Sequence, residues 1–200
     1  MAKVLFINPV VKEEDNPYHV PMGIAQLAAI VIKLNHQVQI FDINAWRVGE
    51  DKIKEVLTSD NWDLIAIGGI TTSYSSIKKI VKICRKIFPK TPISLGGGVL
   101  TSLPKETMKW LPEIDFGFVG ESYKTLPDVL SMIDEKKDEW HKIKGLITRT
   151  ADKGIYFTPE RELLHNLDEL PYPAYNLFPI EEIYFKNSQV PYSEAAMMAK

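Results

Sequence analysis

The chain has 200 residues, and its 24 basic and 26 acidic side chains give a formal net charge of −2. No basic stripe is present, which argues against a nucleic-acid-binding protein. No apolar run reaches the roughly 18 residues of a membrane-spanning helix. The single cysteine, Cys84, excludes an internal disulfide and favours a reducing, cytoplasmic compartment.

Short apolar runs alternate with helical patterns through the first 135 residues. The predicted strands are residues 3–8, 37–44, 63–69, 91–97 and 114–120. The predicted helices are residues 21–36, 50–60, 75–88, 103–111 and 123–135. The third strand, DLIAIGG, is apolar on both faces, as expected in the centre of a parallel sheet.

Strands that alternate with helices through short connections indicate an α/β fold. We predict a flavodoxin-like (Rossmann-like) three-layer sandwich with five parallel strands in the order 2-1-3-4-5, with the Rossmann order as the second possibility. Two strand-like runs within residues 142–160 predict a β-hairpin. Residues 167–185 are rich in proline and aromatic residues and predict an extended strap packed on a surface.

The loops at the carboxyl edge of this predicted sheet are rich in glycine and hydroxyl groups. Ligands of doubly wound sheets bind at that edge, where the strand order reverses. The candidate binding residues there are Asn8, Thr71, Thr72, Ser73, Gly96, Gly97, Gly98, Gly120, Glu121 and Ser122. Glycine opens space beside the backbone and hydroxyls supply neutral hydrogen bonds. This composition favours a large, nearly neutral ligand with amide and hydroxyl groups over a bare phosphate.

Two nucleotide-binding motifs are missing. The first strand is not followed by G-x-G-x-x-G, and G-x-x-x-x-G-K-[ST] does not occur. The alternative function is a noncatalytic module that binds a flavin or nucleotide, or an interaction scaffold. The structural alternatives are plain loop geometry for the glycines, helix capping for the hydroxyls of residues 71–73, and a favourable helix-dipole contact for Glu121.

Seven segments carry a family resemblance through their order along the chain: NPV, PMGIAQLAAIV, VQIFD, DLIAIGGITTS, ISLGGGV, FGFVGES and LDELPYPAYNLFP. Together they resemble the N-terminal cobalamin-binding domain of cobalamin-dependent radical S-adenosylmethionine enzymes, a family of methyltransferases and of cyclases similar to magnesium-protoporphyrin monomethyl ester cyclase. The resemblance implies that the dimethylbenzimidazole tail of cobalamin enters between the loops after strands three and four. The glycines of residues 96–98 then form the slot for the flat base.

The Asp-x-His-x-x-Gly motif of classical cobalamin-binding folds, whose histidine ligates cobalt, is absent, as the resemblance implies for many members of the radical family. The nearest candidate ligand is His19, but Pro17 stands in the place of the aspartate and Gly23 follows four residues after the histidine. We therefore expect this chain to leave the cobalt unligated.

The resemblance also implies a division of the chain: a cobalamin-binding domain at 1–140, the hairpin at 141–160, and a linker at 161–200. We expect a longer protein, because the C-x-x-x-C-x-x-C motif of the radical domain does not occur in these residues. That domain would hold a [4Fe–4S] cluster and S-adenosylmethionine, and the whole protein would catalyse methyl transfer or oxidative cyclisation. The expected partners are cobalamin and that radical domain.

Overall fold

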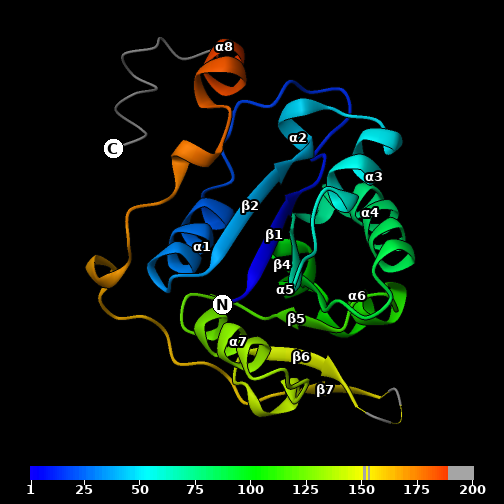
Figure 1. Cartoon of the computed structure of the whole chain (residues 1–200), viewed down its shortest axis with the longest axis vertical. Helices are drawn as coiled ribbons and strands as arrows, with labels where there is room; N and C mark the ends of the chain where they lie inside the picture. Colours follow the sequence, from blue (N-terminus) through cyan, green and yellow to red (C-terminus); the bar gives the residue numbers. More distant parts are fainter. Residues whose placement is uncertain (151, 153, 189–200) are drawn as a thin grey trace.

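The computed structural model describes residues 1–150, 152 and 154–188. Within them, the strands form one sheet in the order β2-β1-β3-β4-β5-β6-β7 (Figure 1). The parallel strands are β1 (Lys3–Asn8), β2 (Gln37–Asp42), β3 (Leu64–Gly68), β4 (Ile93–Gly96) and β5 (Phe116–Phe118). The predicted order 2-1-3-4-5 is therefore confirmed for the parallel part of the sheet.

The predicted strand number is wrong, because the hairpin joins the sheet. β6 (Leu146–Arg149) pairs antiparallel with β5, and β7 (Ile155–Phe157) pairs antiparallel with β6. The sheet of the described residues thus has seven strands. The physical reason is that β5 is buried on both faces and would otherwise expose an unpaired edge. Residues 151 and 153, which lie between the two strands of the predicted hairpin, are outside the described residues.

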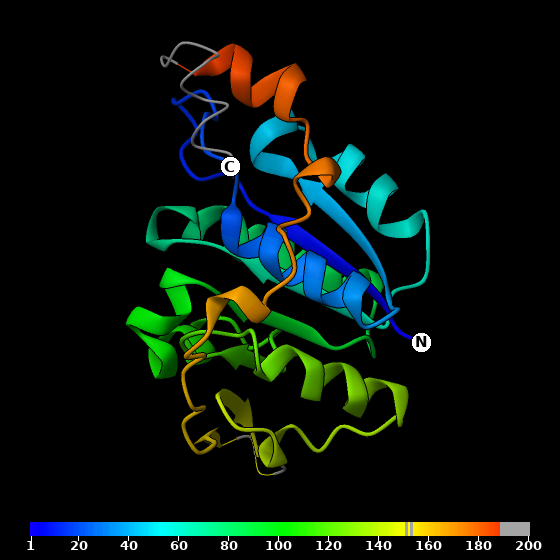
Figure 2. The ribbon, with the colours of Figure 1, turned by 90° about the vertical axis from the view of Figure 1, so that its left-hand side faces the viewer.

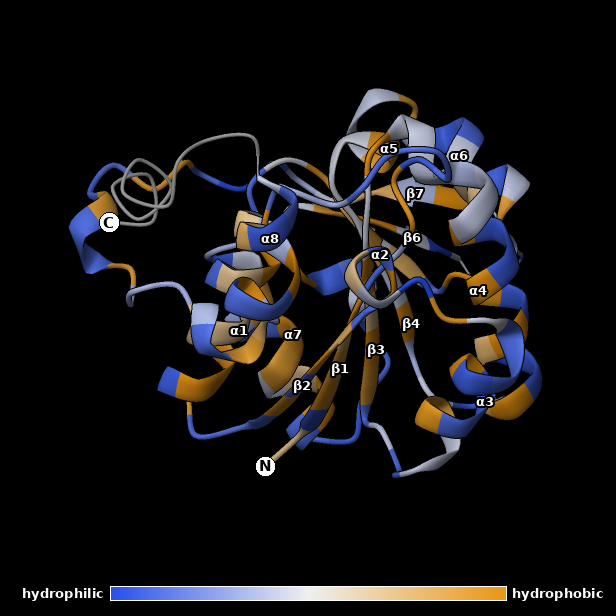
Figure 3. Cartoon of the chain, turned by 90° about the horizontal axis from the view of Figure 1, so that it is seen from above, coloured by the Kyte–Doolittle hydropathy of each residue, from blue (hydrophilic) through white to orange (hydrophobic). Residues whose placement is uncertain are grey.

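Helices cover both faces of the sheet, so that it forms the middle of three layers (Figure 3). α1 (Met22–Lys33) and α7 (Thr125–Asp134) pack on one face. The other face is covered by α3 (Glu50–Thr58), α4 (Tyr74–Ile87) and α6 (Pro104–Trp110). Two short helices, α2 (Ile43–Trp46) and α5 (Gly98–Ser102), follow β2 and β4 and were not predicted.

Both faces of the sheet are apolar because successive side chains of a strand point to opposite sides. On β1, Val4 and Phe6 pack towards α1, whereas Leu5 and Ile7 pack towards α4. Each such buried aliphatic or aromatic side chain contributes about 1.5–3 kcal/mol. Cys84 of α4 belongs to this core, where burial raises the pKa of its thiol to about 12. Among the helices of the described residues, none combines the length and the apolar run needed to cross a bilayer.

The strap, defined here as residues 167–188, passes over α1 (Figure 2). The backbone N–H of Ala174 donates to the carbonyl oxygen of Ala25 at 3.0 Å, and Gln26 Nε2 donates to the carbonyl oxygen of Pro171 at 2.7 Å. The strap contains short 3₁₀ turns at Leu167–Glu169 and Tyr175–Leu177 and a π-helical turn at Ile180–Tyr184, and ends in α8 (Phe185–Asn187). It is packed on the domain surface as the proline-rich composition predicts.

Candidate functional site

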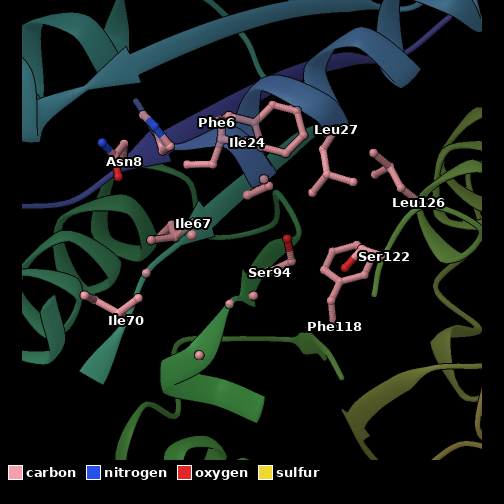
Figure 4. Close-up of a pocket in the computed structure, with 18 of the residues that line it drawn as sticks. Phe6, Asn8, Ile24, Leu27, Ile67, Ile70, Ser94, Phe118, Ser122 and Leu126 are labelled. Atoms are coloured by element: carbon pink, nitrogen blue, oxygen red, sulfur yellow. The ribbon is translucent and has the colours of Figure 1, made fainter. Parts of the chain in front are cut away.

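A cavity of about 510 Å³ opens at the carboxyl edge of the sheet, on the face that α1 and α7 cover (Figure 4). It lies beside the reversal of strand order between β1 and β3, where doubly wound sheets bind their ligands. Its volume falls within the range of small-molecule and cofactor sites. The cavity is therefore the strongest candidate for the functional site among the described residues.

Small residues on two neighbouring strands make the floor of this cavity. Ala66 lies opposite Ser94 in the register of β3 and β4, and Gly68 lies opposite Gly96. The alternation along each strand places all four on the face that α1 covers. The bulky lining around this floor is mostly apolar and includes Phe6, Ile24, Leu27, Phe118 and Leu126. A trench forms because two strands with small side chains lie between strands that carry phenylalanine.

The three successive glycines differ in whether the fold itself requires glycine at their position. Gly97 has a φ of +86°, and a Cβ there would lie 2.5 Å from the carbonyl oxygen of Gly69, so the protein's own backbone requires glycine. A Cβ on Gly96 would meet Phe118 at 3.8 Å, and one on Gly98 would meet Ile70 at 3.9 Å. Both are ordinary contacts. The fold thus tolerates a side chain at 96, and the empty space there belongs to the cavity.

Ser94 is a site residue that the sequence analysis missed. It is fully buried and lines the cavity, and its hydroxyl has no hydrogen-bond partner among the described residues. Figure 4 shows it between Phe118 and the group formed by Phe6, Ile24 and Leu27. A buried hydroxyl without a hydrogen-bond partner lowers stability by about 1–3 kcal/mol. A hydrogen-bond acceptor on a bound ligand would remove this penalty. The available signal was a serine within the otherwise apolar strand PISLG.

A buried hydrogen-bond network holds Asn8 at the β1 side of the cavity. Asn8 Nδ2 donates to Asp42 Oδ1 at 2.8 Å, and the Tyr184 hydroxyl donates to Asp42 Oδ2 at 2.5 Å. The Ala45 backbone N–H also donates to Asp42 Oδ1, at 3.0 Å, and so caps α2. Burial raises the pKa of Asp42 above 3.8, although these donors act in the opposite direction. Burial also raises the pKa of Tyr184.

The cavity brings together most of the residues predicted for the site. Its lining includes Asn8, Gly96, Gly97, Gly98, Gly120, Glu121 and Ser122. Gly120 adopts a φ of +76°, which glycine accepts without strain. His19 also contributes to the lining; it is exposed, and its ring centroid lies 4.2 Å from that of Tyr18.

The hydroxyls of residues 71–73 lie elsewhere. They form a short 3₁₀ turn between β3 and α4 and are not part of the cavity lining, although Ile70 directly before them is. Thr71 and Thr72 are exposed, whereas Ser73 is buried. The capping interpretation does not hold for Ser73, because its side chain makes no capping hydrogen bond to α4.

The lining carries little charge. Among the described residues around the cavity, Glu121 supplies the one carboxylate, and no lysine or arginine is present. Phosphate groups are most strongly held by such cations through charge-assisted hydrogen bonds. The cavity is therefore better suited to a neutral, partly apolar ligand than to a nucleotide held by its phosphates.

Comparisons with known proteins agree with this geometry. The family model described as "B12 binding domain" matches residues 9–130. An uncharacterized methyltransferase of Pyrococcus horikoshii is 31% identical over 175 residues, which cover 86% of this chain and 36% of that protein. The region matched by the family model includes β3, β4 and the loops that line the cavity.

Two solved structures show the same fold at low sequence identity. The radical S-adenosylmethionine methyltransferase TsrM from Kitasatospora setae, with cobalamin and a [4Fe–4S] cluster bound, matches with a TM-score of 0.70 and 19% identity over 86% of this chain and 31% of that one. The cobalamin-dependent S-adenosylmethionine radical enzyme OxsB, with aqua-cobalamin and S-adenosylmethionine bound, matches with a TM-score of 0.74 and 16% identity over 87% of this chain and 24% of that one.

The chain thus spans between 24% and 36% of the length of these three proteins. The family model covers more than half of the chain. This protein therefore belongs to the family of B12-binding domains, and it resembles the cobalamin domains of cobalamin-dependent radical S-adenosylmethionine enzymes.

Proposed function

We propose that this chain is the cobalamin-binding domain of a cobalamin-dependent radical S-adenosylmethionine enzyme, and that the trench receives the dimethylbenzimidazole tail. The observation that carries the proposal is the buried, unpaired hydroxyl of Ser94 on a floor of small residues with apolar surroundings. Dimethylbenzimidazole is a flat, apolar ring system with a ring nitrogen that can accept a hydrogen bond. The residues present therefore fit this group.

The remaining lining supports the same assignment. Gly96, Gly97 and Gly98 leave the backbone uncovered at the entrance, and the Asn8 amide can accept hydrogen bonds from carboxamide N–H groups of the corrin. Gly120, Glu121 and Ser122 offer further acceptors on the opposite side. When bound, cobalamin supplies the cobalt chemistry of methyl transfer or cyclisation. This chain supplies binding and orientation, as proteins generally do for such cofactors.

Some assignments rest on the resemblance and on position rather than on the cavity lining. We propose that Thr71, Thr72 and Ser73 lie near the corrin periphery, because Ile70 immediately before them lines the cavity. We propose no cobalt ligand from this chain, since the nearest candidate is the exposed His19.

For the longer protein, the proposed division is residues 1–140, 141–160 and 161–200, followed by a radical domain with a [4Fe–4S] cluster and S-adenosylmethionine. The names of TsrM and OxsB, which both mention S-adenosylmethionine and cobalamin, support this proposal. The proposed activity is methyl transfer or oxidative cyclisation, in the cytoplasm.

Cobalamin retention tests the proposed function. The purified protein is incubated with hydroxocobalamin, passed through gel filtration, and measured by visible absorbance. We expect coloured protein. A colourless peak at saturating cobalamin, from protein whose circular dichroism shows that it is folded, would overturn the proposal, and yellow protein as purified would indicate a flavin instead. Cobinamide, which lacks the nucleotide tail, is the matched ligand control and should be retained much less.

A further inference from the structure

The strap reaches the cavity through buried side chains. Tyr184, near the end of the strap, is 1% exposed and is the largest of the fully buried side chains among the described residues. Its hydroxyl donates to Asp42, a residue 142 positions earlier in the chain, and Asp42 in turn accepts from the amide of Asn8. Asn8 lines the cavity. A continuous set of hydrogen bonds thus links the strap to the cavity wall.

This network determines which end of the Asn8 amide is available to a ligand. An asparagine amide can present either a donor or an acceptor, depending on its rotation. An ionised Asp42 only accepts, and its two oxygens already receive the Tyr184 hydroxyl and the Ala45 backbone N–H. The Asn8 nitrogen is therefore the end that faces Asp42, and the carbonyl oxygen is left for the cavity.

A second contact of the strap bears on the same side of the cavity. Asn187 Nδ2 donates to the carbonyl oxygen of Pro17 at 3.1 Å. Pro17 lies in the loop between β1 and α1, which also supplies Val11, His19 and Val20 to the cavity lining. The end of the strap therefore contacts this loop as well as the Asn8 network.

We propose that Tyr184 and Asp42 are positioning residues of the cofactor site, which orient the Asn8 amide so that its oxygen receives an N–H group of the ligand. The end of the strap at Tyr184 is then part of the ligand-binding unit, whereas the preceding strap residues serve as a linker. This inference rests on the proposed function and specifies the recognised chemistry: a carboxamide N–H at the β1 side, of the kind that the corrin side chains carry.

Tyr184→Phe tests the inference, because it removes the hydroxyl and keeps the buried ring. Tyr175→Phe is the matched control: Tyr175 also belongs to the strap, and its hydroxyl makes no hydrogen bond to the described residues. Cobalamin affinity is measured by absorbance titration, and folding by thermal unfolding. We expect Tyr184→Phe to weaken affinity about three- to tenfold, the range of one hydrogen bond, and Tyr175→Phe to leave it unchanged.

A thermodynamic cycle separates positioning from a general loss of structure. In an Asn8→Ala background, Tyr184→Phe should cause no further loss of affinity, because the amide that it orients is gone. An equal loss in both backgrounds, or wild-type affinity of Tyr184→Phe itself, would overturn the inference. If Tyr184→Phe does not fold, Asp42→Asn replaces it in the same cycle with the same expectations. Failure of the unchanged protein to bind any cobalamin would refute the proposed function instead.

Discussion

Gly96→Ala should weaken cobalamin binding without destabilising the fold. The new methyl group would enter the cavity floor, and its Cβ would lie 3.8 Å from Phe118, at an ordinary contact distance. Because alanine has less conformational freedom in the unfolded chain, the cobalamin-free protein should keep its stability or gain about 0.5–1 kcal/mol. A ring packed on that floor, however, would meet the methyl group. Overpacking costs about 1–3 kcal/mol, which corresponds to roughly 5- to 150-fold weaker cobalamin binding.

The neighbouring substitution Gly97→Ala is the matched control. Its Cβ would lie 2.5 Å from the carbonyl oxygen of Gly69, and the backbone there has a φ of +86°. Left-handed backbone at a residue other than glycine costs about 1–3 kcal/mol, and the close approach adds to this. We therefore expect Gly97→Ala to lower the free energy of unfolding, which Gly96→Ala should not.

Absorbance titration with hydroxocobalamin and urea unfolding of the cobalamin-free protein provide the two measurements. Wild-type cobalamin affinity of a folded Gly96→Ala variant would refute the reasoning, because it would mean that no part of the cofactor lies on this floor. A Gly97→Ala variant as stable as the unchanged protein would refute the separate argument that the turn after β4 requires glycine.

Two further substitutions probe the buried polar groups. Ser94→Ala should stabilise the cobalamin-free protein by about 1 kcal/mol in urea unfolding, because it removes an unpaired hydroxyl. The same substitution should weaken cobalamin binding about three- to tenfold. Lower stability of the variant would show that the hydroxyl is satisfied in the unchanged protein. For Asp42, burial raises the pKa above 3.8, so its native state binds a proton more readily than the unfolded chain. Its contribution to stability is thus fully present below pH ~4 and is lost as the pH rises through the raised pKa. The unfolding free energy of the wild type minus that of Asp42→Asn should therefore fall as the pH rises over that range, and a constant value would contradict the assignment.

Local sequence patterns determined the alternating elements and therefore the parallel part of the sheet. Runs such as DLIAIGG and the spacing of Ile77, Ile80 and Cys84 reflect burial on both faces of a strand and on one face of a helix. Because the carboxyl ends of parallel strands share one edge, the glycine-rich loops could be placed there without a structure. Asn8, Gly96 and Ser122 consequently lie in one cavity, as the loop positions suggest.

Tertiary structure alone decided the shape of that edge and which side chains line it. The register of β3 against β4 aligns Ala66 with Ser94 and so makes a trench, which neither strand shows by itself. Packing likewise joined β6 to β5, placed the hydroxyls of residues 71–73 outside the lining, and brought Tyr184 to Asp42 across 142 residues. Periodicity is a property of neighbours along the chain. Register and long-range hydrogen bonds depend instead on how separate elements pack, and a single sequence does not encode that packing locally.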